Sequence, residues 1–408
     1  MDNKDKKTAY AVIYIMILLA ASLPLACAYI MEGGENLVWI DRIEEAAEGI
    51  RRGRWMFFPS PGAPGAEGHA LNSNLWLFVP ALVRVWSGDI VTAYRISMML
   101  VNCVTLYSLS MMFGRIFADK TTVLYGVLFS MTCPYRIWLC YDRGDMGKAA
   151  AWMLIPLFMW GMAGLYTSQI RWKEIAACSL AFAGIGYADG IMLAVTAGCA
   201  VLGVLWYKKP QGLLPVAIGG VLYLPGAAYL AEYLFRGGMD AWNLPLGSIM
   251  ADGYVFGQFF TAYAYQAGRP GLGLGLFGAL AVLMWLCFVD NGQDVMKKYG
   301  FYVALSGLLL WMSMSCFPWD LVQRAGGVFL RLVSLMETPG IFFGFASVFL
   351  CVPAAYGVEC LRRREGRFVR IGIPLILLAA SVGGAVYLCN DLTFTRYPLI
   401  WQAAYGGE

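Results

Sequence analysis

Residues 120–167 read KTTVLYGVLFSMTCPYRIWLCYDRGDMGKAAAWMLIPLFMWGMAGLYT. The stretch contains two apolar runs, 120–140 and 149–167, and five charged residues that lie at their junction: Arg136, Asp142, Arg143, Asp145 and Lys148. A helix needs roughly 20 residues to cross the hydrocarbon core of a bilayer, and each run has about that length. The stretch therefore predicts two membrane-spanning helices that are joined by a charged connection at one membrane face.

The rest of the chain has the same apolar character. Of its 408 residues, 60% are hydrophobic and only 14% are charged, which is the composition of an integral membrane protein. Segments long enough to cross a bilayer recur at 9–31, 91–113, 120–140, 149–167, 174–189, 190–206, 213–234, 271–289, 300–316, 338–357 and 369–389. Because lipid offers no partner to backbone polar groups, all of them should be helical. The sequence predicts an all-α polytopic membrane protein with about eleven transmembrane helices in a single domain, 1–408.

The loop charges predict how these helices are oriented. With a cytoplasmic N-terminus, the short loops that carry lysine and arginine, such as Lys208 with Lys209 and the run from Arg362 to Arg370, all face the cytoplasm, as the positive-inside rule requires. Eleven spans then place the C-terminus outside. We expect the first apolar run to be an anchor and not a cleaved signal peptide, because it exceeds twenty residues. A net charge of +4 spread over loops indicates no nucleic-acid partner.

The first predicted outer loop, residues 32–89, is long and carries two further helices. In NLVWIDRIEEAAEGIRRGRW, residues 36–55, apolar side chains recur at helical spacing at Leu37, Ile40, Ile43, Ala47 and Ile50, which predicts an amphipathic helix. A proline- and glycine-rich stretch follows, and residues 71–86 are apolar but too short for a full span. We interpret 71–86 as a re-entrant or interfacial helix. Further outer loops are expected at 235–270 and 316–337.

Four short motifs indicate a family. They are Arg42-Ile43 in the amphipathic helix, PYR at 134–136, the pattern Y-x-RG-x-x-G at 141–147, and FPWDL at 317–321. Together they resemble the YfhO-like membrane proteins, which are catalogued as 6-pyruvoyl-tetrahydropterin synthase-related membrane proteins. The resemblance covers nearly the whole chain, and it places the family's acidic position on Glu35 and its histidine on Trp39. Pterin chemistry itself is not expected, because the sequence lacks the histidine set of a zinc enzyme of that kind.

The resemblance implies a GT-C membrane glycosyltransferase. Such enzymes move a sugar from a polyprenyl-phosphate donor to an acceptor on the outer face, here a cell-envelope glycopolymer at a bacterial plasma membrane. The chain departs from the family in three respects: Trp39 replaces histidine, Lys148 stands where glutamate is usual, and METPGIF at 336–342 lacks an arginine. A non-catalytic membrane partner descended from such an enzyme is therefore an alternative. A lipid-linked saccharide flippase is another, although the charges gather at one face and no internal repeat is visible.

Sugar transfer from a lipid phosphate requires a carboxylate base and cations that bind the departing phosphate. The candidates for the base are Glu35 and Asp41, and those for the phosphate are Arg136, Arg143 and Lys148. Asp142 and Asp145 could hold a Mg²⁺ or Mn²⁺ ion beside the phosphate. Secondary candidates are Arg42, His69, Asp320 and Arg324. The opposing interpretation is that the charges pair with one another and with lipid headgroups at helix ends.

Overall fold

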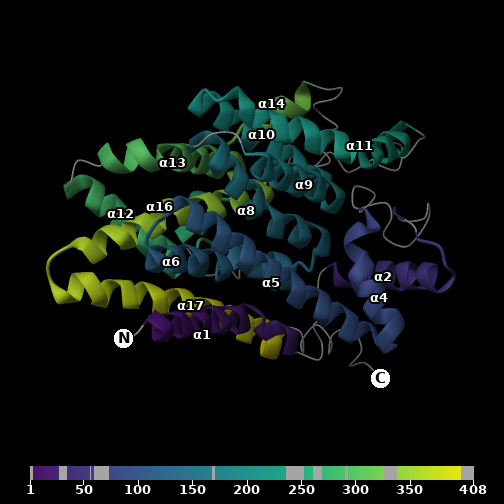
Figure 1. Cartoon of the computed structure of the whole chain (residues 1–408), viewed down its shortest axis with the longest axis horizontal. Helices are drawn as coiled ribbons and strands as arrows, with labels where there is room; N and C mark the ends of the chain where they lie inside the picture. Colours follow the sequence, from purple (N-terminus) through teal and green to yellow (C-terminus); the bar gives the residue numbers. More distant parts are fainter. Residues whose placement is uncertain are drawn as a thin grey trace.

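The computed structural model describes residues 3–26, 35–55, 57–58, 73–167, 171–235, 252–260, 269–289, 293–325 and 338–396 (Figure 1). This part of the chain is helical and contains no β-strand, only an isolated bridge between Tyr254 and Met314. The α-helices are α1 (Asn3–Ala21), α2 (Asn36–Arg51), α4 (Phe78–Ser87), α5 (Ile90–Ile116), α6 (Lys120–Met131), α7 (Pro134–Ile137), α8 (Met146–Thr167), α9 (Trp172–Ala188), α10 (Gly190–Tyr207), α11 (Leu213–Phe235), α12 (Leu274–Val289), α13 (Gln293–Ser313), α14 (Trp319–Arg324), α16 (Gly340–Arg363) and α17 (Ile373–Asp391).

The all-helical polytopic membrane fold predicted from the sequence is confirmed. Each of the eleven predicted segments overlaps a helix, but within the described residues only six helices are both long and apolar enough to cross a membrane. They are Ile90–Ile116, Met146–Tyr166, Gly190–Tyr207, Pro210–Tyr229, Gly340–Arg363 and Phe368–Phe394. A bent pair, Lys120–Met131 with Pro134–Asp142, brings the number to seven if it forms one span. The count of eleven spans stays a prediction.

The predicted span 120–140 is not one straight helix. The chain breaks after α6 and continues through α7 into a π-helical turn, Trp138–Asp142, at an angle of 45°. Pro134 explains the break, because proline lacks a backbone N–H and disfavours helical backbone in the residue before it. The break directs the chain from α7 toward the charged junction at 142–148.

The amphipathic helix of the first loop is present as α2, but the predicted apolar face is wrong in part. Leu37 is 52% exposed, whereas the polar residues Asn36 and Arg42 are buried beside Trp39 and Ile43. Asn36 accepts a hydrogen bond from the Tyr94 hydroxyl at 2.8 Å. Arg42 Nη2 donates to Asn74 Oδ1 at 2.7 Å. Buried polar groups are stable only with such partners, so these two bonds set which face of α2 packs inward.

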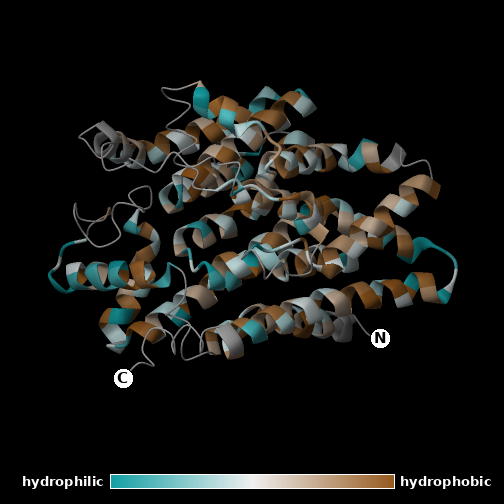
Figure 2. Cartoon of the chain, turned by 180° about the vertical axis from the view of Figure 1, so that it is seen from behind, coloured by the Kyte–Doolittle hydropathy of each residue, from teal (hydrophilic) through white to brown (hydrophobic). Residues whose placement is uncertain are grey.

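The fold separates two polar ends by apolar helices. In Figure 2 hydrophilic residues gather on α2 at one end and on the connection between α16 and α17 at the other, while hydrophobic residues dominate the helices between them. At the second end Arg362 pairs with Asp119 at 2.6 Å, and Arg115 pairs with Glu174 at 2.8 Å. These contacts bring three of the predicted cytoplasmic loops together. The orientation of the chain in a membrane stays a prediction.

The core of the bundle is α16, whose membrane-crossing part is completely buried and which packs against α6, α12 and α13. Where α7 meets α16, the Tyr135 ring lies directly on Gly344 and against Phe343, with ring centroids 5.8 Å apart. A Cβ atom at Gly344 would be only 2.2 Å from Tyr135 Cε1. This close approach fixes the position of α7, and therefore of the junction that follows it.

Gly344→Ala should lower the free energy of unfolding by about 1–3 kcal/mol, because the added methyl group overpacks a core from which the buried Tyr135 ring has no room to move. The matched control is Gly198→Ala in α10, where a Cβ meets nothing within 4 Å. The control should leave stability unchanged or raise it slightly. Thermal unfolding in detergent compares the two variants, and an equal effect of both would contradict this packing.

Candidate functional site

Four charged residues form a continuous group at the junction between α2 and α8. Arg143 pairs with Glu35, with Nη2 and Nε at 3.0 and 3.1 Å from Oε1. Arg143 Nε lies 3.9 Å from Asp145 Oδ2, and the same carboxylate oxygen accepts a hydrogen bond from Lys148 Nζ at 2.7 Å. The charges alternate in sign from Glu35 to Lys148. We call these residues the charge chain.

The backbone holds the charge chain in place. The N–H of Glu35, which begins α2, donates to the carbonyl of Arg143 at 2.7 Å. Gly144 adopts a left-handed φ of +69°, and a Cβ there would lie 2.3 Å from Asn36 Oδ1. Only glycine meets both conditions without strain. Asp145 then caps α8, because its Oδ1 accepts a hydrogen bond from the N–H of Lys148 at 2.9 Å.

Burial deepens along the charge chain. The side chains of Glu35 and Arg143 are 27% and 18% exposed, whereas those of Lys148 and Asp145 are 8% and 0% exposed. Burial alone would raise the pKa of the Asp145 carboxyl, but the charges of Lys148 and Arg143, with the hydrogen bonds from Lys148, outweigh burial and hold that pKa well below its usual range. Asp145 is therefore ionised at neutral pH. The Glu35–Arg143 end is the less buried end of the charge chain, although Glu35 Oε2 itself is buried.

Arg42 is a further cation beside this group. It is 1% exposed, and its guanidinium lies 4.7 Å from the centroid of the Trp39 ring. Burial lowers the pKa of Arg42 to about 10, an effect that Glu45, Tyr229 and Asp145 partly offset. Arg42 is therefore charged at neutral pH, and Asp145 lies within its electrostatic reach. Trp39, at the position where the resemblance expects histidine, packs its ring against the Arg42 guanidinium in a cation–π contact.

Arg136, predicted to bind phosphate, belongs to a different buried group. Its guanidinium donates to the Asn102 side chain and, at 3.3 Å, to the carbonyl of Met131. Asn102 Nδ2 in turn donates to the hydroxyls of Tyr141 and Ser22 at 2.7 and 2.8 Å. Arg136 therefore links α5, α7 and the end of α1, a structural role that its position in the sequence did not indicate.

The remaining candidates lie on α2, on α14 and in the turn that precedes the charge chain. Asp41 is exposed on α2, and Asp142 is half-buried in the π-helical turn. Asp320 and Arg324 lie on α14, where Arg324 is exposed and the neighbouring Trp319 stacks on Phe342. His69 lies outside the described residues.

The residues present do not fit the predicted Mg²⁺ or Mn²⁺ site. Across the described ranges, no group of three or more histidine, cysteine, aspartate or glutamate side chains could hold a metal ion. The Asp145 carboxylate, half of the proposed pair with Asp142, is already bound by Lys148 and faces Arg143. The charge chain is therefore a pair of cations, each bound by a carboxylate.

Three residues of the site were not predicted. Asn36 supports Gly144, Asn74 binds Arg42, and the Trp138 ring lies 5.9 Å from the Arg143 guanidinium. Asn74 had a visible signal, since it is a polar residue at the start of a largely apolar segment, whereas Asn36 begins an amphipathic helix that carries many other polar residues. Trp138 had none, because aromatic residues are routine at a membrane boundary.

Comparison with known proteins gives only a weak likeness to solved structures. No protein-family model and no curated protein matches the sequence, so membership of the YfhO-like family stays a prediction. Among solved structures, the chain is similar to ArnT from Cupriavidus metallidurans, crystallised with undecaprenyl phosphate. The two share 13% sequence identity with a TM-score of 0.42, over 98% of this chain and 78% of that chain.

Asp145→Asn should lower the free energy of unfolding by about 3–5 kcal/mol, because it leaves Lys148 buried without its counterion while the cap on α8 is kept. Combining it with Lys148→Met should restore most of the loss, since no buried charge is then left unbalanced. Equilibrium unfolding in detergent measures both effects.

The control for this measurement is Glu48→Gln, which breaks exposed ion pairs on α2 and should have a far smaller effect on stability, because water screens such pairs. Equal stability of Asp145→Asn and the control would contradict the buried pair.

Proposed function

We propose that the chain is a membrane glycosyltransferase of the GT-C type, which transfers a sugar from a polyprenyl-phosphate donor to a cell-envelope acceptor at the outer face of a bacterial plasma membrane. The observation that carries the proposal is the charge chain at the start of α8, where Arg143 and Lys148 are each held by a carboxylate. The resemblance of the sequence motifs to GT-C glycosyltransferases supports the same function.

In this proposal Arg143 and Lys148 bind the donor phosphate. Arg143 presents a planar guanidinium suited to two phosphate oxygens, and Lys148 presents a compact charge one helical turn further into the protein. Both cations already have counterions, so an entering phosphate competes with Glu35 for Arg143. Arg42, charged and buried nearby, adds to the positive field that attracts the phosphate.

Glu35 is then the proposed base. When phosphate takes over Arg143, the Glu35 carboxylate is released from its ion pair at the less buried end of the charge chain and can accept the proton of an acceptor hydroxyl. The bond between the sugar C1 and the phosphate oxygen breaks, and a bond from the acceptor oxygen to C1 forms. The polyprenyl phosphate leaves with its negative charge stabilised by Arg143 and Lys148. Asp145 is a positioning residue that holds Lys148.

A non-catalytic membrane partner is the second candidate. The observation that favours it is the mutual neutralisation of the four charges, since such a group can serve simply to dock α2 on α8. Variants of the charge chain distinguish the two functions. A variant that loses sugar transfer but keeps the stability of the wild type indicates that the charge chain is catalytic, whereas a variant that loses only stability indicates a structural group.

Glu35→Gln should reduce sugar transfer by at least about 100-fold, because it removes the base and keeps the shape of the side chain. Donor binding should be kept or become tighter, because the carboxylate no longer competes with the phosphate for Arg143. Arg143→Ala should reduce transfer by a similar factor and also weaken donor binding, because it removes a phosphate ligand. The measurement is transfer of radiolabelled sugar from a panel of polyprenyl-phosphate sugars by the purified protein in proteoliposomes.

The matched controls are Glu48→Gln and Arg51→Ala, which alter exposed ion pairs on the same side of the molecule, on α2, and should keep full activity. Transfer by Glu35→Gln at the wild-type rate would refute Glu35 as the base. If the folded wild type transferred no sugar from any donor in the panel, the non-catalytic role would replace the proposed activity.

A further inference from the structure

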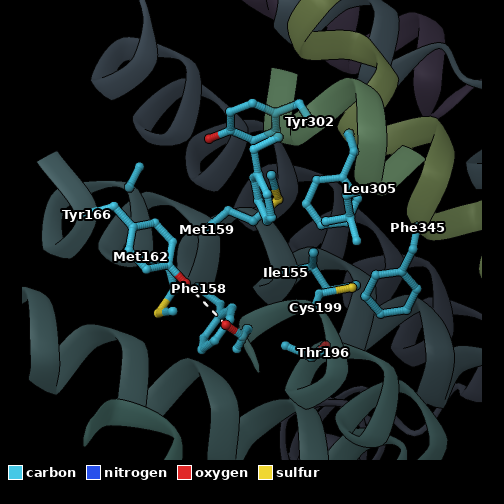
Figure 3. A pocket seen from close by; sticks show the side chains of 14 residues that line it. Ile155, Phe158, Met159, Met162, Tyr166, Thr196, Cys199, Tyr302, Leu305 and Phe345 are labelled. Atoms are coloured by element: carbon cyan, nitrogen blue, oxygen red, sulfur yellow. Dashed lines mark hydrogen bonds between the residues drawn. The ribbon is translucent and has the colours of Figure 1, made fainter. Parts of the chain in front are cut away.

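The interior between α8, α10, α13 and α16 offers little room for a ligand. The space that Met159, Tyr302 and Leu305 border in Figure 3 has a volume of only about 40 Å³, whereas small-molecule sites in proteins span roughly 300–1,000 Å³. The hydroxyls of Tyr166 and Thr196, which also line it, already donate to backbone carbonyls. The dense group of charges on the connection between α16 and α17, by contrast, lies at the surface.

The connection between α16 and α17 is rich in arginine. Residues 362–370 read RRREGRFVR, with five arginines, one glutamate and no lysine. Each of the other basic loops that are predicted on the same face contains lysine, at Lys120, Lys173, Lys208 and Lys297. Either cation satisfies the positive-inside rule, so the rule does not explain the choice of arginine. A guanidinium binds two phosphate oxygens at once, whereas an ammonium is a point charge.

The first arginines of this connection are held by the protein itself. Arg362 Nη1 lies 2.6 Å from Asp119 Oδ2, at the start of α6. Arg363 pairs with a carboxylate on α16, and the Arg364 guanidinium lies 6.0 Å from the centroid of the Trp285 ring on α12. These contacts attach the connection to α6 and α12 and give the three residues a structural role.

Arg367 and Arg370 differ from the arginines before them. Both are exposed, and within the described ranges no carboxylate forms an ion pair with either of them. The backbone around them is well defined, because Gly366 adopts a left-handed φ of +98° and its carbonyl accepts a hydrogen bond from the Arg370 N–H at 3.0 Å. The turn therefore presents two guanidinium groups that are available to an anion from outside the chain.

The residues beside these two arginines are apolar and face outward. Phe368 is 67% exposed, and its ring lies close to Gly372, where a Cβ atom would be 2.7 Å from Phe368 Cδ2. Ile371 and Leu375 are 44% and 54% exposed. All of them belong to Phe368–Phe394, one of the helices that are apolar enough to cross a membrane. Arg367 and Arg370 therefore lie where the apolar surface of a membrane span begins.

We propose that the connection between α16 and α17 binds the headgroup of an anionic phospholipid. Arg367 and Arg370 contact its phosphate, and Phe368 lies among its acyl chains. A phospholipid carries its phosphate at the level where hydrocarbon begins, and the connection presents its cations and apolar side chains in the same order. The site lies at the polar end of the bundle that is opposite α2 (Figure 2), so it is separate from the charge chain and independent of the proposed function.

The test removes the two available cations and keeps those that hold the fold. The variant is Arg367→Gln with Arg370→Gln. Its matched control is Arg51→Gln with Arg52→Gln, which removes the same charge from an exposed part of α2 at the other polar end. Purified protein in neutral detergent is titrated with dioleoyl phosphatidylglycerol, dioleoyl phosphatidylcholine and inorganic phosphate, and binding is measured by microscale thermophoresis. Thermal unfolding without added lipid shows that each variant is folded.

The variant should bind phosphatidylglycerol at least about tenfold more weakly than the wild type, while the control should bind it as the wild type does. Unchanged affinity in the variant, or an equal loss in the control, would overturn the proposal. Phosphatidylcholine that binds as tightly as phosphatidylglycerol would overturn the requirement for an anionic lipid. Inorganic phosphate that binds as tightly as the lipid would replace the phospholipid by a soluble phosphate.

Arg367→Lys with Arg370→Lys tests the phosphate contact without changing the charge. This variant should bind phosphatidylglycerol at least about threefold more weakly, because lysine cannot contact two phosphate oxygens at once. Wild-type affinity in it would overturn direct contact between these guanidinium groups and the phosphate. None of these measurements involves sugar transfer, so the lipid site can stand if the proposed activity fails.

Discussion

The contact between Arg143 and Glu35 is the constraint on which the candidate site depends. It combines an ion pair with a backbone hydrogen bond from the Glu35 N–H to the Arg143 carbonyl, and it ties the start of α2 to the turn that begins α8. Gly144 allows that turn, and Asp145 completes it by capping α8 and binding Lys148. One short junction therefore sets both the position of α2 and the order of the charges, from the partly exposed Glu35 to the buried Asp145.

A single helix, α8, carries both a charged end and an apolar inward side. Because α8 begins at Met146, directly after its cap Asp145, and continues through the bundle, its inward face carries a cation at one end and apolar side chains along the rest. The bilayer imposes the same division on a lipid phosphate, whose head lies at the interface and whose tail lies in hydrocarbon.

Much of this fold could be predicted from the sequence, because a bilayer permits few solutions. Long apolar segments must be helices, and each predicted segment overlaps one. The direction of a helix face is harder to predict: α2 buries Arg42 and exposes Leu37 because Asn74 and Tyr94, distant in sequence, supply hydrogen bonds. Contacts between residues that are distant in sequence also limit what could be predicted of the site. Charges between apolar runs identified Arg143, Asp145 and Lys148, but no local pattern distinguishes them from Arg136, whose partner Asn102 lies on another helix.

The central claim is that the charge chain binds a lipid phosphate, and an experimental structure of the protein with undecaprenyl phosphate tests it most directly. Our account predicts phosphate density within hydrogen-bond distance of Arg143 and Lys148, with the Glu35 carboxylate displaced from Arg143. Phosphate bound elsewhere, with the ion pair from Glu35 to Arg143 intact, would contradict the claim and leave the charge chain as a structural link between α2 and α8.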